Sequence, residues 1–194
     1  MEPSLTKRAL RLEWFTVSWN VLEAAVAIAA GVVANSIALV GFGLDSVIET
    51  ASAVILLWRL KQTGEAGEAA ERRAVRLVGV SFFVLAAYVT WEAVSSLMLR
   101  ETPQASLPGM ILAAASLIVM PLLGRAKLRL AREMGSRALA ADSQETMACA
   151  YLSATLLGGL LANALLGWWW ADPVAALGIV LFLVREGWEA FEED

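Results

Sequence analysis

The sequence predicts an all-α membrane protein with six transmembrane helices and both termini in the cytoplasm, and three observations support this prediction. Hydrophobic residues make up 59% of the 194 residues and charged residues only 18%, whereas soluble domains are about 45–50% apolar and about 25% charged. The apolar residues gather in stretches of the length that crossing a bilayer requires. All but one of the 15 basic residues fall on one side of the resulting topology.

Six apolar stretches follow a polar, basic N-terminal tail at residues 1–12. No small-residue cleavage site follows this tail promptly, so we expect a retained first helix and not a signal peptide. We interpret Asp172-Pro173 as an N-cap with proline at the first helical position, which would start the last span. The expected spans are residues 14–34, 37–60, 75–99, 108–123, 138–166 and 173–187. The fourth span is short, but it can extend as a helix into the basic segment that follows Gly124.

The basic residues set the expected orientation, because positive charge is enriched in the cytoplasmic segments of membrane proteins. Only Arg100 falls in an expected outer loop. The net charge of −4, with no basic patch, excludes nucleic acid as a partner. We expect the protein to lie in a bacterial inner membrane. One of the cytoplasmic basic groups lies between the fourth and fifth spans and consists of Arg125, Lys127, Arg129, Arg132 and Arg137.

Two acidic residues lie inside the second span, where a charge is costly. Asp45 and Glu49 are four residues apart and therefore share one face of a helix. Their mutual repulsion in a low dielectric requires that one carboxyl takes a proton or that a cation bridges the pair. Gly41 and Gly43 lie roughly on the same side and would let another backbone approach closely.

The fifth span repeats this spacing, with Glu145 four residues before Cys149 and Asp142 one turn nearer the cytoplasm. If the two spans are neighbours, Asp45, Glu49, Glu145 and Cys149 offer three carboxylates and one thiolate. Four such donors suit a tetrahedral, borderline-soft ion such as Zn²⁺ better than Mg²⁺ or Ca²⁺. The sequence contains no histidine, the commonest ligand for such ions.

Simpler roles remain open for several of these residues. Cys149 could be a small packing residue, and Asp142 could be solvated or cap a helix. Glu23 in the first span could line the ion path, relay protons or accept a hydrogen bond from a neighbouring helix. Glu92, near the outer end of the third span, is a further candidate for the ion path or a proton relay.

Around these residues the chain resembles the cation diffusion facilitator family of metal/proton antiporters. The resemblance is strongest at residues 36–52, 141–153 and 170–178. In that family the second span carries His or Asp followed four residues later by Asp, and the fifth carries His followed four later by Asp. The resemblance therefore implies that Asp45, Glu49, Glu145 and Cys149 bind a transported ion.

The sequence departs from the family pattern in two respects. Glu145 stands in place of the family's histidine and Cys149 in place of the following aspartate, so the metal preference of relatives does not transfer. The sequence given stops at Asp194, so we expect one transmembrane transporter domain over residues 13–194 without the cytoplasmic C-terminal domain common in the family. A homodimer would then form through the transmembrane helices.

These observations predict a secondary transporter that exports a divalent metal, with Zn²⁺ favoured over Cd²⁺, Co²⁺, Fe²⁺ and Mn²⁺, in exchange for protons. Its expected partners are the metal ion, protons and the lipid bilayer, and no catalytic cofactor or enzymatic activity is expected. One alternative is a proton-coupled exporter of organic cations, which tryptophans could bind by cation–π contact. The other is a membrane metal-binding regulator that does not transport.

Overall fold

Long helices make up most of the part of the chain that the structure describes, residues 3–59 and 65–192, and this confirms the all-α fold class. The structure is a computed structural model. Leu60, the expected end of the second span, lies outside the described residues. In chain order the helices are α1 (Pro3–Ala34), α2 (Ile37–Arg59), α3 (Glu65–Leu99), α4 (Leu107–Met134), α5 (Arg137–Leu166) and α6 (Ala171–Glu192).

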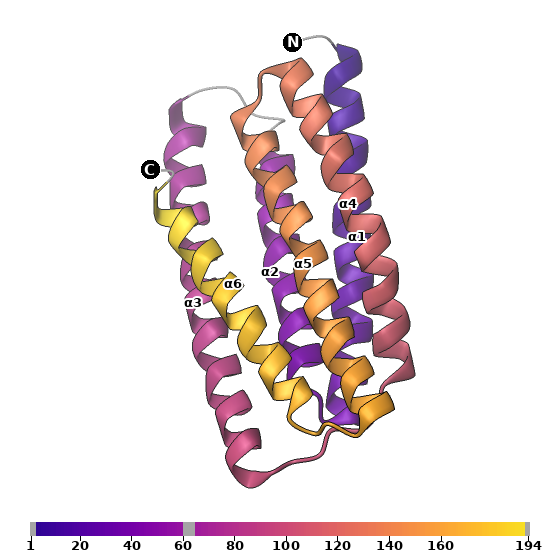
Figure 1. Cartoon of the computed structure of the whole chain (residues 1–194). Coiled ribbons are helices and arrows are strands. Elements are labelled where there is room, and N and C mark those ends of the chain that lie inside the picture. Colours follow the sequence, from indigo (N-terminus) through magenta and orange to yellow (C-terminus); the bar gives the residue numbers. More distant parts are fainter. Residues whose placement is uncertain (1–2, 60–64, 193–194) are drawn as a thin grey trace.

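The helices form one bundle with α2 and α5 in its middle (Figure 1). α1 packs along α2, α4 along α5 and α3 along α6, and α2 also contacts α3, α5 and α6. Both termini and the α4–α5 connection lie at one end of the bundle, and the α1–α2, α3–α4 and α5–α6 connections lie at the other (Figure 1). The two helices that carry the expected metal ligands are therefore central neighbours.

Local sequence explains where the helices begin and end. Ser106 and Ser136 are the N-caps of α4 and α5, and their hydroxyls accept hydrogen bonds from Gly109 N and Leu139 N. Gly135 and Gly167 follow the same two helices in the left-handed conformation, with φ of 63° and 66°, which glycine adopts without steric cost.

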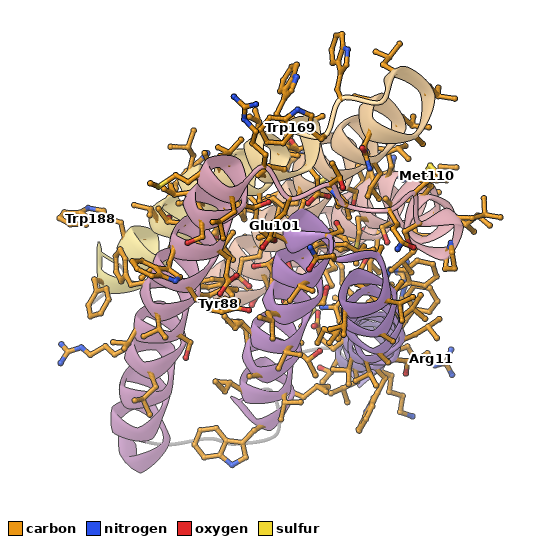
Figure 2. The ribbon with its side chains drawn as sticks, turned by 90° about the horizontal axis from the view of Figure 1, so that it is seen from below. Arg11, Tyr88, Glu101, Met110, Trp169 and Trp188 are labelled. Atoms are coloured by element: carbon orange, nitrogen blue, oxygen red, sulfur yellow. The ribbon has the colours of Figure 1, made fainter. Side chains whose placement is uncertain are left out.

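The distribution of polar and apolar side chains is inverted relative to a soluble protein. Large apolar side chains such as Val33 (80% exposed) and Met98 (79%) point outward, and Trp188 lies at the periphery (Figure 2). Ionisable side chains such as Glu23 and Asp45, by contrast, are buried inside the bundle. This arrangement is expected where the surroundings are lipid and charged groups must face the bundle interior.

Five of the described helices are long and apolar enough to cross a membrane, and the protein is therefore an integral membrane protein. These spans lie in α1 to α5. α6 is not among them, because Asp172, Arg185 and Glu186 confine its uncharged stretch to residues 173–184.

The helices extend well beyond several expected spans at the end where the termini lie. α1 begins at Pro3, inside the expected tail, and α4 continues to Met134 although its expected span ended at residue 123. At Gly124 the two helices lie close together, because an added Cβ would lie 2.7 Å from the Met147 side chain of α5. The segment after Gly124 is a helix, as the extension of the fourth span allowed.

The glycines of α2 face two different helices, so the expectation that they share one side is wrong. A Cβ on Gly43 would lie 2.9 Å from the backbone nitrogen of Ile28 on α1. A Cβ on Gly41 would instead lie 3.1 Å from Val89 on α3. The close backbone approach therefore occurs at Gly43 and joins α1 to α2.

Asp172 is not the N-cap of the last helix, because α6 already begins at Ala171. Its carboxylate instead accepts hydrogen bonds at the start of α2, from the Ser36 hydroxyl (2.5 Å) and the backbone amides of Ile37 (2.9 Å) and Ala38 (3.3 Å). The Ser36 hydroxyl also accepts a hydrogen bond from Leu39 N. Asp172 thus satisfies the free amides of α2 and holds that helix against α6.

We expect Asp172→Ala to lower the free energy of unfolding by about 2–3 kcal/mol, because it leaves buried donors at the start of α2 without an acceptor. Thermal unfolding in detergent micelles would measure the change. Glu101→Gln is a matched control, since Glu101 is an exposed carboxylate at the same end that accepts one hydrogen bond from Asn35. The control should stay within about 0.5 kcal/mol of wild type, and an equal effect of both substitutions would contradict the role of Asp172.

Candidate metal site

Asp45 and Glu49 lie one turn apart on α2, inside the bundle. Asp45 is 1% exposed, and neither of its carboxylate oxygens has a hydrogen-bond partner. Glu49 is also buried and accepts a hydrogen bond of 3.1 Å from the Asn20 side-chain amide on α1. A buried carboxylate without donors is costly, so Asp45 requires a proton or a cation to offset its charge.

Glu145 and Cys149 lie on the face of α5 that meets α2. The Ser52 hydroxyl of α2 donates a hydrogen bond of 3.3 Å to the Glu145 carboxylate. Cys149 is fully buried in the apolar core. The structure thus places the two i, i+4 pairs on adjoining helices.

The four expected ligands do not form a closed coordination shell. In residues 3–59 and 65–192, no group of three or more Cys, Asp or Glu side chains is arranged to hold a metal ion. The charges of Asp45 and Glu145 nevertheless act on Glu49. The arrangement is therefore two neighbouring donor pairs that would have to draw together around an ion.

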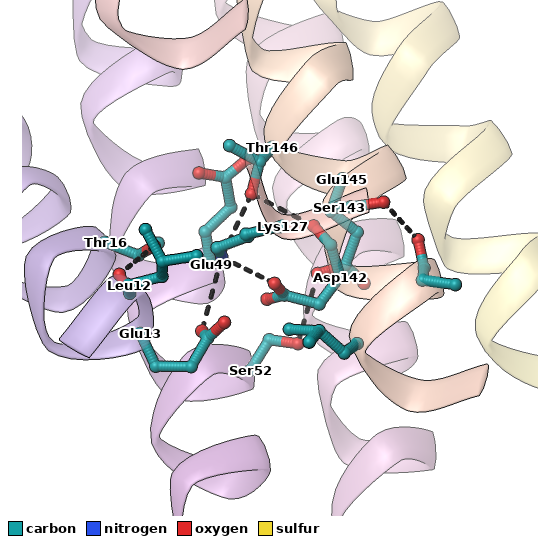
Figure 3. A network of polar contacts seen from close by, with 12 residues as sticks. Leu12, Glu13, Thr16, Glu49, Ser52, Lys127, Asp142, Ser143, Glu145 and Thr146 are labelled. Atoms are coloured by element: carbon teal, nitrogen blue, oxygen red, sulfur yellow. Dashed lines mark hydrogen bonds and ion pairs between the residues drawn. The ribbon is translucent and has the colours of Figure 1, made fainter. Parts of the chain in front are cut away.

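Asp142 is neither solvated nor a helix cap, because it forms a buried ion pair with Lys127 of α4 at 2.5 Å. The same ammonium contacts Glu13 of α1 at 3.2 Å and the Thr146 hydroxyl of α5 at 3.2 Å (Figure 3). Lys127 is therefore not a solvated member of the basic group between the fourth and fifth spans, since its side chain is fully buried. We call Glu13, Lys127, Asp142 and Thr146 the lysine network.

A sequence signal for Lys127 was present but overlooked. The buried residues of α4 recur every three or four positions, and Lys127 continues the series after Met120 and Leu123. Such a stripe is the buried face of a helix. Arg125 and Arg129 lie off the stripe and are exposed. Position on the stripe thus distinguishes the buried lysine from its basic neighbours.

Glu23 accepts hydrogen bonds from two neighbouring helices, which confirms one of the three roles expected for it. The Ser46 hydroxyl of α2 donates to it at 3.1 Å, and the Ser116 hydroxyl of α4 donates to its other oxygen. Its role in an ion path or proton relay stays a prediction. Glu92 is partly buried on α3 and makes no hydrogen bond or ion pair with the described residues.

Glu186 of α6 is a further buried acid that sequence reasoning missed, because it follows the exposed Arg185 near the end of the chain. Ala175, Ile179 and Leu183 are spaced four positions apart, and Glu186 follows three positions later on the same buried stripe of α6. Its charge acts on Asp45 of α2 and on Glu145 of α5. The third helix around the site therefore adds negative charge.

The interior of the bundle is rich in acidic side chains. Among the described residues Lys127 is the one buried basic side chain. When these acids are deprotonated, they attract cations and repel anions. The arrangement can therefore bind a cation between α2 and α5. The buried acidic side chains are Glu13, Glu23, Asp45, Glu49, Asp142, Asp172 and Glu186.

Comparisons with known proteins identify relatives over most of the chain. The family model described as the cation efflux transmembrane domain matches residues 14–194. Transmembrane protein 163 of Xenopus laevis is 27% identical over 163 residues, which cover 82% of this chain and 54% of that protein. The uncharacterized transporter sll1263 of Synechocystis sp. is 26% identical over 155 residues, which cover 76% of this chain and 50% of that protein. The chain spans about half the length of these curated relatives.

The burial of Cys149 predicts its reactivity, and because it is the only cysteine of the chain it can be followed directly. We expect N-ethylmaleimide to label it at least about tenfold more slowly in detergent micelles than after unfolding in SDS, since a buried thiol is inaccessible and inert. Arg129→Cys in a Cys149→Ser background is the control, because that position is exposed. Equal labelling rates at the two positions would contradict the packing around Cys149.

Proposed function

The chain belongs to the cation efflux family, and from this we propose that it is a secondary transporter that exports a divalent transition-metal cation in exchange for protons. Members of this family are cation transporters and not enzymes. We favour Zn²⁺ as the ion, with Cd²⁺, Co²⁺, Fe²⁺ and Mn²⁺ as the other candidates.

One observation carries this proposal, namely the pair of carboxylates on α2 facing the Glu145–Cys149 pair on α5 inside a bundle with an apolar exterior. Both oxygens of Asp45 lack a hydrogen-bond donor. In a membrane protein such residues are expensive and mark ion pathways. A divalent cation would offset the negative charge and would be held by donors from two helices.

The chemistry of the donors supports a borderline-soft metal. Three carboxylates supply hard oxygen ligands, and the Cys149 thiolate would supply a soft sulfur ligand, a combination that Zn²⁺ accepts in tetrahedral sites. Ca²⁺ would require more oxygen ligands than these side chains offer. No histidine occurs in the chain, so the ligands must come from acids and the thiol.

We propose that protons compete with the metal for the same carboxylates. A metal ion binds only the deprotonated ligands, so binding from the cytoplasm releases protons and protonation from the outside releases the metal. The exchange requires the donors on α2 and α5 to become accessible from each side in turn. Movement of helices around a fixed site is the general solution in secondary transporters.

In this proposal α6 is the sixth span, and the end of the bundle that carries both termini faces the cytoplasm of a bacterial inner membrane. The basic residues support that orientation, since Arg8, Arg11, Arg129 and Arg132 all lie on the segments of α1 and α4 near that end. A homodimer through the transmembrane helices remains our expectation for the assembly.

We expect Asp45→Ala and Glu145→Ala each to lower metal flux by about tenfold or more. Removing a metal ligand should reduce activity at least as much as removing a residue that only hydrogen-bonds to a ligand. The measurement is uptake of Zn²⁺, Cd²⁺, Co²⁺, Mn²⁺ or Fe²⁺ into proteoliposomes with an imposed pH gradient and a metal-sensitive dye. Glu133→Gln is the matched control, since Glu133 is an exposed acid paired with Arg8 at 3.7 Å.

Each alternative has its own outcome in this assay. Flux in the two alanine variants equal to that of wild type would show that the site lies elsewhere. Flux of an organic cation in place of metal would support the organic-cation exporter. Tight metal binding without flux in wild type would support the non-transporting regulator.

We expect a fluorescent protein joined to the C-terminus to be fluorescent in bacterial cells, and alkaline phosphatase joined after Glu101 to be active. The reason is that basic segments are retained in the cytoplasm, whereas the α3–α4 connection would lie outside. An active phosphatase at the C-terminus would contradict the orientation.

A further inference from the structure

Lys127 lies at the centre of a buried contact between three helices. Its ammonium is 2.5 Å from Asp142 of α5 and 3.2 Å from Glu13 of α1, and no part of its side chain is exposed. It also donates to the Thr146 hydroxyl of α5 at 3.2 Å. Figure 3 shows the ammonium between these groups, with Glu49 and Glu145 drawn in the same close-up.

The lysine network adjoins the donor pairs of the candidate metal site. Thr146, which accepts a hydrogen bond from Lys127, follows directly after Glu145 on α5. The charge of Lys127 acts on both Glu49 and Glu145. A divalent ion held by Glu49 and Glu145 would therefore experience repulsion from the ammonium, and in a low dielectric this repulsion is strong.

We propose that Lys127 is a resident cation of the transport site, which lowers its affinity for the divalent ion and keeps Asp142 out of the ligand set. This inference rests on the proposed metal transport. Lys127 is a positioning residue in this scheme, because it acts on the metal through charge and through Asp142 and does not bind the metal itself.

Stability alone is a weak reason for this arrangement. A buried ion pair loses much of its attraction to desolvation, and apolar residues of similar size are often as stabilising. The network also leaves one Glu13 oxygen, Oε1, without a hydrogen-bond partner. With both carboxylates ionised, the two acids and one ammonium have a net charge of −1, which is less attractive to a divalent ion than the −2 that the acids alone would have.

The test compares Lys127→Met with the double variant Lys127→Met/Asp142→Asn. The single substitution changes the net charge of the network from −1 to −2, whereas the double variant restores −1 without the lysine. Isothermal titration with Zn²⁺ in detergent micelles at constant pH gives the affinity and stoichiometry. Flux in proteoliposomes gives KM and the maximal rate.

For Lys127→Met we expect Zn²⁺ to bind about tenfold more tightly or better, with a lower KM and a lower maximal rate, because the repulsion is removed and release is slowed. Glu13 and Asp142 should then hold a second Zn²⁺. The double variant should bind one Zn²⁺ with an affinity within about threefold of wild type, since its net charge is matched.

The outcomes separate this inference from the proposed function. Wild-type affinity and stoichiometry in Lys127→Met would overturn the inference while leaving metal transport intact. If Lys127→Met does not fold, the double variant tests the inference instead. If the double variant bound Zn²⁺ more than about tenfold more weakly than wild type, Asp142 would itself be a ligand, and the inference would be overturned. A wild-type protein that neither binds nor transports any of the metals would overturn the proposed function and with it the role of Lys127.

Discussion

The structure depends on one constraint, which is that every buried charge in a bundle surrounded by lipid has to be offset from inside the protein. Water cannot solvate these groups, so the partners must come from neighbouring helices. α2 shows the result most clearly. Asp172 of α6 binds its first turn, Asn20 of α1 donates to Glu49, and Ser52 donates to Glu145 of α5. The hydrogen bonds that satisfy the buried carboxylates are thus the same ones that position the helix bearing the candidate ligands.

Much of the fold was predictable because its signals are local. Apolar stretches of bilayer length predict helices, and residues such as Ser106, Gly135 and Gly167 mark their ends within one turn. The continuation of α4 past residue 123 was also predictable, because the buried stripe can be followed through the polar, basic segment after Gly124. The contact of Asp172 with Ser36 was missed, since the two residues are 136 positions apart and no local pattern joins them.

The candidate site likewise has a part that local sequence predicts and a part that depends on helix packing. Helix periodicity alone puts Asp45 beside Glu49 and Glu145 one turn from Cys149, so each pair follows from the sequence. How the pairs lie relative to each other depends on the packing of α2 against α5, which spacing does not determine. Lys127 illustrates the difficulty, because a single basic residue in a basic segment is typical of a solvated surface. Its place on the buried stripe of α4 marks it as buried, but no local pattern joins it to its partner Glu13, 114 positions away.

A transporter must bind its ion firmly enough to select it and weakly enough to release it. A cluster of buried acids without a counter-charge fails the second requirement, because the attraction for a divalent cation grows with each uncompensated carboxylate in a low dielectric. Protonation can supply the counter-charge at one point of the cycle. A lysine fixed in the protein supplies it at every point and takes the place of an ion at Asp142 and Glu13. The chain therefore contains the means to moderate a site that its acids alone would make too strong, and that moderation does not depend on which metal is carried.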